Sequence, residues 1–318
     1  MSGPVLEVEG LRVGFGDAHP VDGVSFSVAP GECLGLVGES GSGKSLTLRA
    51  ALGLLPPAAA VTAGELRFDG AAYAAADVRG HGISMIFQEP MSALNPLMRV
   101  GDLIAEALRA RGTARAAART RAVALMDDVG IPDPARRARA WPHELSGGMR
   151  QRVMIAMALA GEPRVLLCDE PTTALDVTVQ DQILDLLDGL RRDRGLAIVF
   201  VTHNLALIDR VAQRLAVMYA GRIVETGAVG RVLAAPHHPY TARLLGCVPE
   251  LDHPAARLDT IPGRPPDPRD YPGGCRFAPR CKHAVERCEA APYRAVPTTD
   301  LERSSACVRW AELSEEAA

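Results

Sequence analysis

Residues 38–45 carry the feature that most limits what this chain can fold into. They fit the phosphate-binding loop pattern of Gly, four residues and Gly-Lys-Ser. An apolar run at 33–37 precedes the loop and predicts a buried parallel strand, and residues 46–55 predict a helix that stops at Pro56. Because strand, loop and helix follow in the order that such a site needs, the sequence predicts an α/β nucleotide-binding fold. The loop residues are Gly38, Glu39, Ser40, Gly41, Ser42, Gly43, Lys44 and Ser45.

The chemistry of the loop follows from its residue types. Glycines allow successive backbone N–H groups to curl around an anion, and the helix N-terminus adds a partial positive charge. Lys44 is expected to reach the β- and γ-phosphates of a nucleotide, and the Ser45 hydroxyl to hold Mg²⁺. Upstream, Phe15 lies between two glycines. It can stack on adenine or pack in the core, and its position leaves both open.

Polar side chains follow further predicted strands at the points where those strands end. In open α/β sheets, ligand-binding groups project from this carboxyl edge. Gln88 follows the apolar run 83–87 and can ligate Mg²⁺ or orient water. His203 follows the run 196–201, and it is either structural or in contact with the γ-phosphate.

Asp169 and Glu170 end the apolar run that begins at Val165. We expect Asp169 to hold the water shell of Mg²⁺ opposite Ser45, and Glu170 to reach an attacking water. Carboxylates at a strand end are often only solvated. A phosphate loop in the same chain, together with Pro171 directly after the pair, favours the metal and base roles.

Residues 91–140 are rich in Ala and Arg and predict a helical subdomain inserted into the α/β core. Apolar residues at helical spacing mark helices over 100–110 and 114–129. The arginine cluster at 136–139 could touch nucleic acid, but a solvated helix face fits the acidic balance of the chain better.

A second potential anion site lies downstream, where Ser146, Gly147 and Gly148 precede a helix predicted over 150–160. Serine and glycine at a helix start leave backbone N–H groups accessible to an anion. Many helices begin in this way, so the signal is weak when taken alone.

The bulk composition narrows the class of protein. A formal net charge of −3 argues against a surface built for polyanions. No apolar run reaches the ~18 residues that crossing a bilayer needs, and residues 1–7 lack the basic-then-apolar order of a signal peptide. These features predict a cytoplasmic protein, whose seven cysteines are thiols or metal ligands rather than disulfides.

From residue 227 onward, short apolar pieces alternate with prolines and turns around four spaced cysteines. A metal would order such a segment, because ligand bonds replace the missing hydrophobic core. Four thiolates suit zinc or an iron–sulfur cluster, and free thiols or a disulfide remain alternatives. Nearby Arg276, Arg280, Lys282 and Arg287 would offset the thiolate charge. The four cysteines are Cys275, Cys281, Cys288 and Cys307.

Taken together, these motifs resemble those of the ATP-binding subunits of ABC transporters. The resemblance implies a P-loop cassette over 1–235, with a RecA-like core, an antiparallel β subdomain and a helical subdomain at about 90–160, followed by a C-terminal region over 236–318. It also implies that Asp176 belongs to the nucleotide site. The family signature usually ends in Gln, where this chain has Met149. The resemblance rests on the phosphate loop, Gln88, Leu145–Met149, Asp169-Glu170, Ala174–Asp176 and His203.

Three stretches resemble, more narrowly, the ATPases of dipeptide, oligopeptide and nickel importers: Phe87–Pro96, Leu145–Arg152 and His238–Thr241. This resemblance implies a peripheral protein at the cytoplasmic face of the cell membrane. Its implied partners are a second, paralogous ATPase subunit, two permeases and an extracytoplasmic solute-binding protein, with no nucleic acid. It also implies a [4Fe-4S] cluster on the C-terminal cysteines in preference to Zn²⁺.

The ATP sites of that family are composite, and the phosphate loop of one subunit faces the Ser-Gly-Gly helix of another. The resemblance therefore implies that residues 146–148 act on the ATP of the partner. Glu170 would polarise water, and His203 would sense the γ-phosphate. The metal would be served by Ser45, Gln88 and Asp169.

Peptide uptake is the preferred function, with import of nickel or another small solute as the alternative within the family. A cytoplasmic ABC ATPase that works on DNA or ribosomes is disfavoured, because the sequence has neither a second cassette nor a long coiled coil. A redox-sensing regulatory ATPase, with the cysteine region as its active part, is the remaining alternative.

Overall fold

The computed structural model describes residues 3–173, 175–247, 260–290, 295–298 and 303–316. Ala174 of the predicted 174–176 turn and parts of the C-terminal region lie outside this range. Contacts divide the chain into two compact units, which we describe separately. The first unit comprises Met1–Leu6, Val28–Glu32 and Phe68–Phe200, and the second Glu7–Ser27, Cys33–Arg67 and Val201–Ala318.

The first unit contains the strands that carry the predicted acidic and amide side chains. Strands β6 (Ile83–Ile86) and β7 (Val165–Asp169) pair in parallel, with Ile86 opposite Cys168. Strand β8 (Ala197–Thr202) lies on the other side of β7. Every residue of these strands is buried, which explains why they are continuous apolar runs rather than alternating ones.

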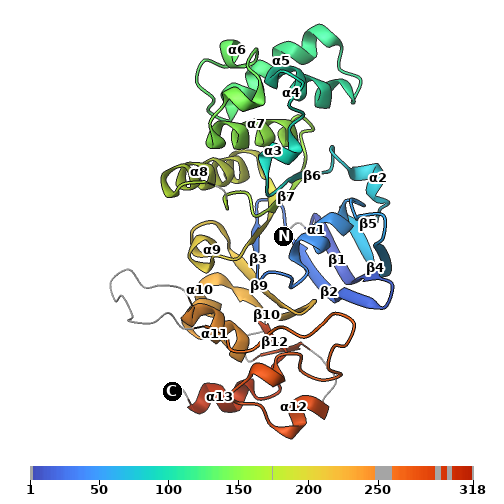
Figure 1. Cartoon of the computed structure of the whole chain (residues 1–318), viewed down its shortest axis with the longest axis vertical. Coiled ribbons are helices and arrows are strands. Elements are labelled where there is room, and N and C mark those ends of the chain that lie inside the picture. Colours follow the sequence, from blue (N-terminus) through green and yellow to red (C-terminus); the bar gives the residue numbers. More distant parts are fainter. Residues whose placement is uncertain (1–2, 174, 248–259, 291–294, 299–302, 317–318) are drawn as a thin grey trace. The chain divides into compact units, whose positions relative to one another are not determined.

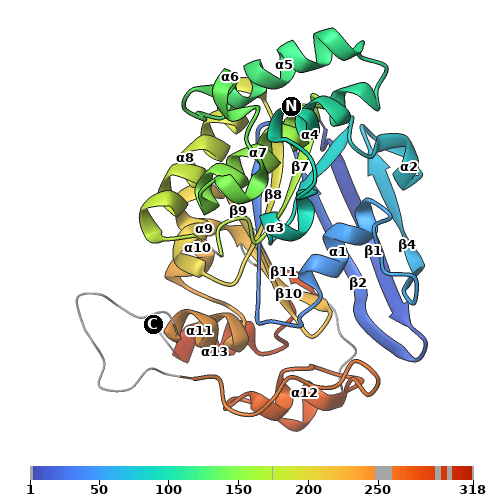
Figure 2. The ribbon, with the colours of Figure 1, turned by 45° about the horizontal axis from the view of Figure 1, so that its top comes forward.

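The other described elements of this unit are helices and the short strand β5, and Figures 1 and 2 show α4, α5 and α7 gathered into one group. The helices predicted over 100–110 and 114–129 are confirmed. Leu103, Ile104 and Leu108 form the buried stripe of α4 that their spacing predicts. The elements are β5 (Ala71–Ala72), α2 (Ala75–Val78), α3 (Pro90–Ala93), α4 (Val100–Arg109), α5 (Arg115–Asp128), α6 (Pro134–Arg137), η1 (Pro142–Glu144), α7 (Gly147–Leu159) and α8 (Val177–Arg194).

The second unit contains the predicted phosphate loop and two groups of strands. Strands β2 (Ala18–Val28), β1 (Leu6–Phe15) and β4 (Ala60–Phe68) are neighbours in that order. Strand β3 (Cys33–Val37) pairs in parallel with β9 (Arg214–Tyr219), with Val37 opposite Val217. The order continues from β9 to β10 (Arg222–Ala228), β12 (Ser304–Ser305) and β11 (Val296–Pro297).

The C-terminal region is rich in turns, as predicted, and it also adds two short strands to this sheet. Glu225 of β10 lies opposite Ser305 of β12 in antiparallel pairing. Strands of two residues have no periodicity that a sequence pattern could reveal. The helices of the second unit are α1 (Lys44–Ala51), α9 (Leu205–Val211), α10 (Val229–Ala234), α11 (Pro239–Gly246), η2 (Ala278–Arg280), α12 (Glu286–Ala290) and α13 (Trp310–Glu316).

The end of α1 corrects the sequence prediction. The helix ends at Ala51 rather than running to Leu55, so Pro56 does not terminate it. Gly53 adopts a left-handed φ of 60°, and the next amide, that of Leu54, donates to the Arg49 carbonyl at 2.8 Å. A glycine C-cap of this kind satisfies the last helical carbonyls, and it acts before the prolines are reached.

Within the described ranges, none of the helices combines the length and the apolarity that crossing a bilayer requires.

Candidate nucleotide-binding site

The phosphate loop joins the fully buried β3 to α1, and its glycines are required by the surrounding backbone. Gly38 has a φ of 155°, and a Cβ there would lie 2.0 Å from the Met218 carbonyl oxygen. Gly43 caps α1 with a φ of 104°, and a Cβ there would lie 2.5 Å from the Pro20 carbonyl oxygen. By contrast, a Cβ on Gly41 would meet nothing within 4 Å. The loop is therefore braced on one side by backbone and open at its tip.

Lys44 folds back over the loop. Its Nζ donates to the carbonyl oxygens of Gly38 and Glu39 at 2.8 and 2.9 Å and to Ser42 Oγ at 3.3 Å. The side chain is only 5% exposed, so the ammonium is held by the loop rather than by water. A positive charge fixed beside the open tip is suited to a phosphate, which would exchange for one of these acceptors.

Two residues hold the start of this loop, and the sequence analysis did not predict their contact with it. The Glu39 amide donates to the hydroxyl of Tyr240 in α11 at 2.8 Å, and Arg280 forms an ion pair with the Glu39 carboxylate at 2.7 Å. Burial raises the pKa of the Tyr240 hydroxyl, which keeps it neutral. These residues lie 201 and 241 positions from Glu39, and no local pattern marks contacts at such separations.

The other predicted residues of the second unit flank strands. Phe15 is the last residue of β1 and is half-buried, so part of the residue remains accessible. His203 directly follows β8 and is exposed. Both positions suit contact with a ligand, and their roles toward a nucleotide stay predictions.

In the first unit the structure brings Gln88 and Glu170 together, as the parallel pairing of β6 and β7 predicts. Gln88 Nε2 donates to Glu170 Oε2 at 3.4 Å, and Thr173 Oγ1 donates to the same oxygen at 2.9 Å. Glu170 has a left-handed φ of 47°, which ends β7 at Asp169. Asp169 itself is 1% exposed. The edge of the sheet thus holds one buried and one partly exposed carboxylate beside an amide.

The Ser-Gly-Gly segment starts α7, as predicted. Ser146 is the N-cap and accepts from the Met149 amide at 3.4 Å, and both Ser146 and Gly147 are exposed. A Cβ on Gly148 would lie 2.4 Å from Val179 Cγ1 of α8. Asp176 caps α8 by accepting from the Val179 amide at 3.0 Å, which gives that carboxylate a structural role in addition to the predicted one.

The four C-terminal cysteines line one small cavity, together with Phe277, Ala284 and Leu313. All four are free thiols, and burial raises the pKa of Cys307 to about 12. Burial also raises the pKa of Cys275 and Cys281. Among the described residues, no three His, Cys, Asp or Glu side chains are arranged to hold a metal ion.

The three arginines that the sequence analysis placed beside these cysteines pair with carboxylates instead, contrary to the prediction. Arg276 pairs with Asp22, Arg280 with Glu39 and Arg287 with Glu312. A carboxylate attracts a guanidinium more strongly than a protonated thiol does, because only the carboxylate is charged at neutral pH.

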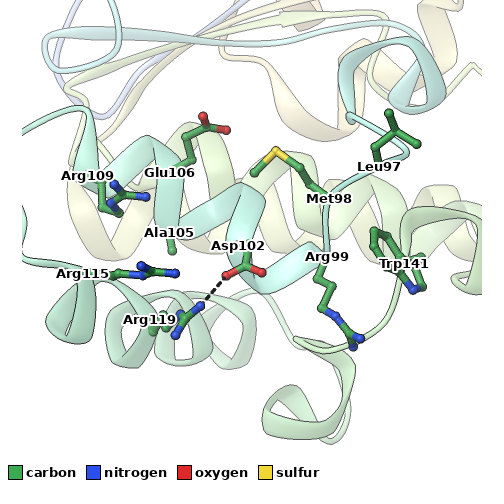
Figure 3. A pocket seen from close by; sticks show the side chains of 10 residues that line it. All are labelled: Leu97, Met98, Arg99, Asp102, Ala105, Glu106, Arg109, Arg115, Arg119 and Trp141. Atoms are coloured by element: carbon green, nitrogen blue, oxygen red, sulfur yellow. Dashed lines mark hydrogen bonds and ion pairs between the residues drawn. The ribbon is translucent and has the colours of Figure 1, made fainter.

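Another cavity, of about 310 Å³, lies on the helical part of the first unit (Figure 3). Its wall mixes arginines, acidic side chains and the indole of Trp141, and Arg119 forms an ion pair with Asp102 at 3.4 Å across it. At its rim Leu97 is 82% exposed. Leu97 is therefore an exposed apolar side chain beside a cavity with charged walls.

Comparison with known proteins decides the family. The sequence profile of the ABC transporter family matches residues 21–173, and that of the oligopeptide/dipeptide transporter C-terminal region matches 224–288. A peptide import ATP-binding protein of Brucella abortus (strain 2308) is 47% identical over 334 residues, with 98% of both chains covered. The chain belongs to the ABC transporter ATP-binding family. A second such protein, from Brucella suis biovar 1 (strain 1330), is 48% identical to this ABC protein over 296 residues, covering 90% of this chain and 89% of the relative.

Solved structures agree with the fold of this ABC protein. CbiO1 of Clostridium perfringens, part of the ABC transporter complex CbiONQ, has a TM-score of 0.63 and 26% identity, covering 73% of this chain and 91% of its own. The ATP-binding cassette MJ0796, a dimer bound to ADP and phosphate, has a TM-score of 0.62 and 26% identity, covering 70% and 98%. The predicted P-loop ABC fold is confirmed, and ATP hydrolysis coupled to transport is the activity of this ABC protein.

Proposed function

We propose that this ABC protein is the ATP-hydrolysing subunit of an importer of dipeptides or oligopeptides. The observation that carries the proposal is 47% identity, over 98% of both chains, to a relative named for peptide import. The match of residues 224–288 to the oligopeptide/dipeptide transporter C-terminal region also supports it, since most of that region lies outside the cassette. Nickel import remains the alternative within the family, and the names of both Brucella relatives favour peptides.

The loop residues 38–45 bind the phosphates of ATP. Two features fit this role. No side chain blocks the loop tip at Gly41, and the buried ammonium of Lys44 attracts an anion. Phe15 stacks on adenine, and His203 contacts the γ-phosphate. Mg²⁺, when bound, neutralises charge on the phosphates, and oxygen donors from Ser45, Gln88 and Asp169 are the ligand types that it prefers.

Glu170 orients the attacking water and accepts its proton. Its side chain is partly exposed, and Gln88 and Thr173 both donate to its Oε2, which fixes the carboxylate at the edge of the sheet. Phosphoryl transfer needs little covalent help, so positioning and charge neutralisation supply most of the rate.

A second cassette completes the site. Ser146 and Gly147 are exposed at the start of α7, and their backbone N–H groups contact the ATP bound by that partner. Asp176 also belongs to the nucleotide site. The partner is a paralogous subunit. Two permeases and an extracytoplasmic solute-binding protein complete the importer, and this chain lies at the cytoplasmic face of the cell membrane. The cassette spans 1–235 and the C-terminal region 236–318.

The cavity beside Leu97 is the contact for a permease. Its apolar rim and its mixture of charges suit a short amphipathic helix from another chain (Figure 3).

The cysteine-lined cavity holds a [4Fe-4S] cluster, with Zn²⁺ as the alternative. Four free thiols on one cavity fit the donor set of either group. Anaerobic purification should give brown protein with stoichiometric iron and sulfide. Colourless protein with stoichiometric zinc would instead identify the metal as zinc. If the Cys288→Ser variant keeps its full metal content, this cavity is not the metal site.

Nucleotide binding is tested most cleanly through the lysines, because the chain has only two, Lys44 and Lys282. An acyl-phosphate derivative of ATP should acylate Lys44, and excess MgATP should protect it, while the exposed Lys282 serves as the internal control. Lys44→Ala should abolish nucleotide affinity, whereas Lys282→Ala should leave it unchanged. Equal labelling of both lysines, without protection, would contradict the loop assignment.

The substrate class is tested by uptake. Cells that lack this chain should lose accumulation of a labelled tripeptide and regain it with the wild-type chain but not with Glu170→Gln. Normal tripeptide uptake together with lost uptake of labelled nickel would instead support the nickel alternative.

A further inference from the structure

The phosphate loop contains a carboxylate, Glu39, whose charge opposes the binding of an anion. We propose that Arg280, from the C-terminal region, is a positioning residue of the nucleotide site that neutralises Glu39 and fixes the start of the loop. The inference rests on the proposed function of residues 38–45 as the ATP-binding loop. It assigns to the C-terminal region a direct part in ATP affinity.

The contact is bidentate and well anchored. Arg280 Nη1 and Nη2 donate to the two carboxylate oxygens of Glu39 at 2.7 and 3.0 Å. The remaining donors reach the carbonyls of Pro262 and Ile261 at 2.8 and 3.1 Å. Arg280 Nη1 also donates to the Tyr219 hydroxyl at 3.2 Å. A planar guanidinium with all these partners has one orientation available, so it can hold the carboxylate at a fixed place.

The pair is buried mainly on the arginine side. The side chain of Arg280 is 4% exposed, and that of Glu39 is 26% exposed. A pair at this depth is screened less than a surface pair, so its neutralising effect on the loop is substantial. Removing Arg280 alone would leave a bare carboxylate next to the Glu39 carbonyl that binds Lys44.

The second anchor of Glu39 comes from the same side of the loop. The Glu39 amide donates to Tyr240, whose ring packs 4.5 Å from that of Tyr219, centroid to centroid. Tyr219 is the hydroxyl partner of Arg280. Side chain and main chain of Glu39 are thus fixed by one buried cluster, which makes the first turn of the loop rigid before nucleotide arrives.

The same arginine connects the loop to the cysteine-lined cavity. Arg280 ends the short helical turn η2, which lies between Cys275 and Cys281 in the chain. Both cysteines line the cavity, and the Cys281 amide donates to the Ala278 carbonyl at 3.1 Å within that turn. A change at Cys275 or Cys281, such as the loss of a thiol, therefore shifts Arg280 and, through Arg280, the Glu39 carboxylate.

The test measures the affinity of the full chain for a non-hydrolysable ATP analogue. Arg280→Gln should weaken binding by about tenfold at low salt, and the loss should shrink as salt screens the bare carboxylate. Two controls should bind as the wild type does. Lys282→Gln removes a charge two residues away, and Arg276→Gln removes a guanidinium of similar burial that pairs with Asp22 instead of the loop.

A second substitution separates charge neutralisation from general stability. Glu39→Gln in the Arg280→Gln background removes the bare carboxylate, so it should restore most of the lost affinity. If Arg280 only stabilised the fold, the double variant would bind no better than Arg280→Gln. That result, or wild-type affinity of Arg280→Gln, would overturn the proposal. Unchanged binding by Lys44→Ala would instead reject the loop assignment itself.

The connection to the cysteines has its own arm. Cys281→Ser should weaken analogue binding in the wild-type background and have no further effect in the Arg280→Gln background. Equal losses in the two backgrounds would overturn the route through Arg280. Thermal unfolding of each variant, measured in parallel, reports whether the variant is folded.

Discussion

Glu170 combines unusual backbone with fixed side-chain geometry. Its left-handed φ of 47° is costly for a residue with a Cβ, and such strain persists only where surrounding contacts maintain it. Here Gln88 and Thr173 hold one oxygen of the carboxylate. The strained turn directs the Glu170 carboxylate away from the path of β7. A carboxylate that was only solvated would need neither this backbone conformation nor these contacts.

Glu170→Gln should bind ATP and lose about 10²–10⁴-fold in turnover, because the amide cannot accept a proton from water. Thr173→Val should lose less, since it frees the carboxylate without removing it. Single-turnover hydrolysis measures both. Normal turnover by Glu170→Gln would remove Glu170 from its role.

His238 gives a pH dependence of stability. It is fully buried, its Nδ1 accepts the Tyr240 amide at 3.1 Å, and burial lowers its pKa from 6.5 to about 4. Between these values the unfolded chain binds a proton that the folded chain does not. Stability should therefore fall as the pH drops from about 6.5 toward 4, by up to about 3 kcal/mol.

Denaturant unfolding at pH 7 and pH 5 measures this effect. His238→Asn keeps an acceptor at the start of α11 and has no proton to bind, so its stability should change less between the two pH values. An identical pH dependence in the two proteins would show that other groups control it.

At the residue scale, the sequence alone identified the side chains whose roles follow from their immediate neighbours in the chain. The loop 38–45, the acidic pair after β7 and the amide after β6 follow from residue type and position at a strand end. The sequence did not predict that Tyr240 and Arg280 contact the loop. Their contacts with Glu39 depend on packing between segments about 200 or more residues apart, which leaves no periodic or spacing signal.

At the scale of elements, the start of α7 is set by its approach to α8. Gly148→Ala would place a Cβ 2.4 Å from Val179 Cγ1, so the two helices would have to separate. Overpacking of this kind costs about 1–3 kcal/mol. Thermal or denaturant unfolding should show the loss, and Val179→Ala should recover most of it in the double variant. Failure of that recovery would place the strain elsewhere.

We predict that a permease binds at the cavity beside Leu97 and that this contact couples ATP hydrolysis to transport. Leu97→Asp would place a charge on its apolar rim without disturbing buried packing, because Leu97 is 82% exposed. ATPase activity measured together with the partner cassette should be unchanged, while peptide uptake in cells should fall. Uptake at the wild-type level would show that the permease binds elsewhere.

Element boundaries show where sequence patterns are insufficient. The helices α4 and α5 were predictable because apolar spacing continues along them. The end of α1 was not, since Gly53 competes with Pro56 as the terminator and only the backbone conformation decides between them. The pairing of β10 with β12 joins residues far apart in the chain, so it too was invisible.

At the scale of the whole molecule, the central claim is that this chain supplies only part of each ATP site. It carries a phosphate loop and, separately, an exposed Ser-Gly-Gly helix start, and the family resemblance assigns the latter to the ATP of a partner. The related cassette MJ0796, in its structure with ADP and phosphate, is a dimer. A chain with these two features should hydrolyse ATP only when a second cassette is present.

The most direct measurement is the rate of ATP hydrolysis per subunit over a series of protein concentrations, with and without a purified partner cassette. We predict that the specific rate rises with concentration or on addition of the partner, and that it approaches zero at high dilution. A specific rate that is high, constant across the series and indifferent to the partner would contradict the account.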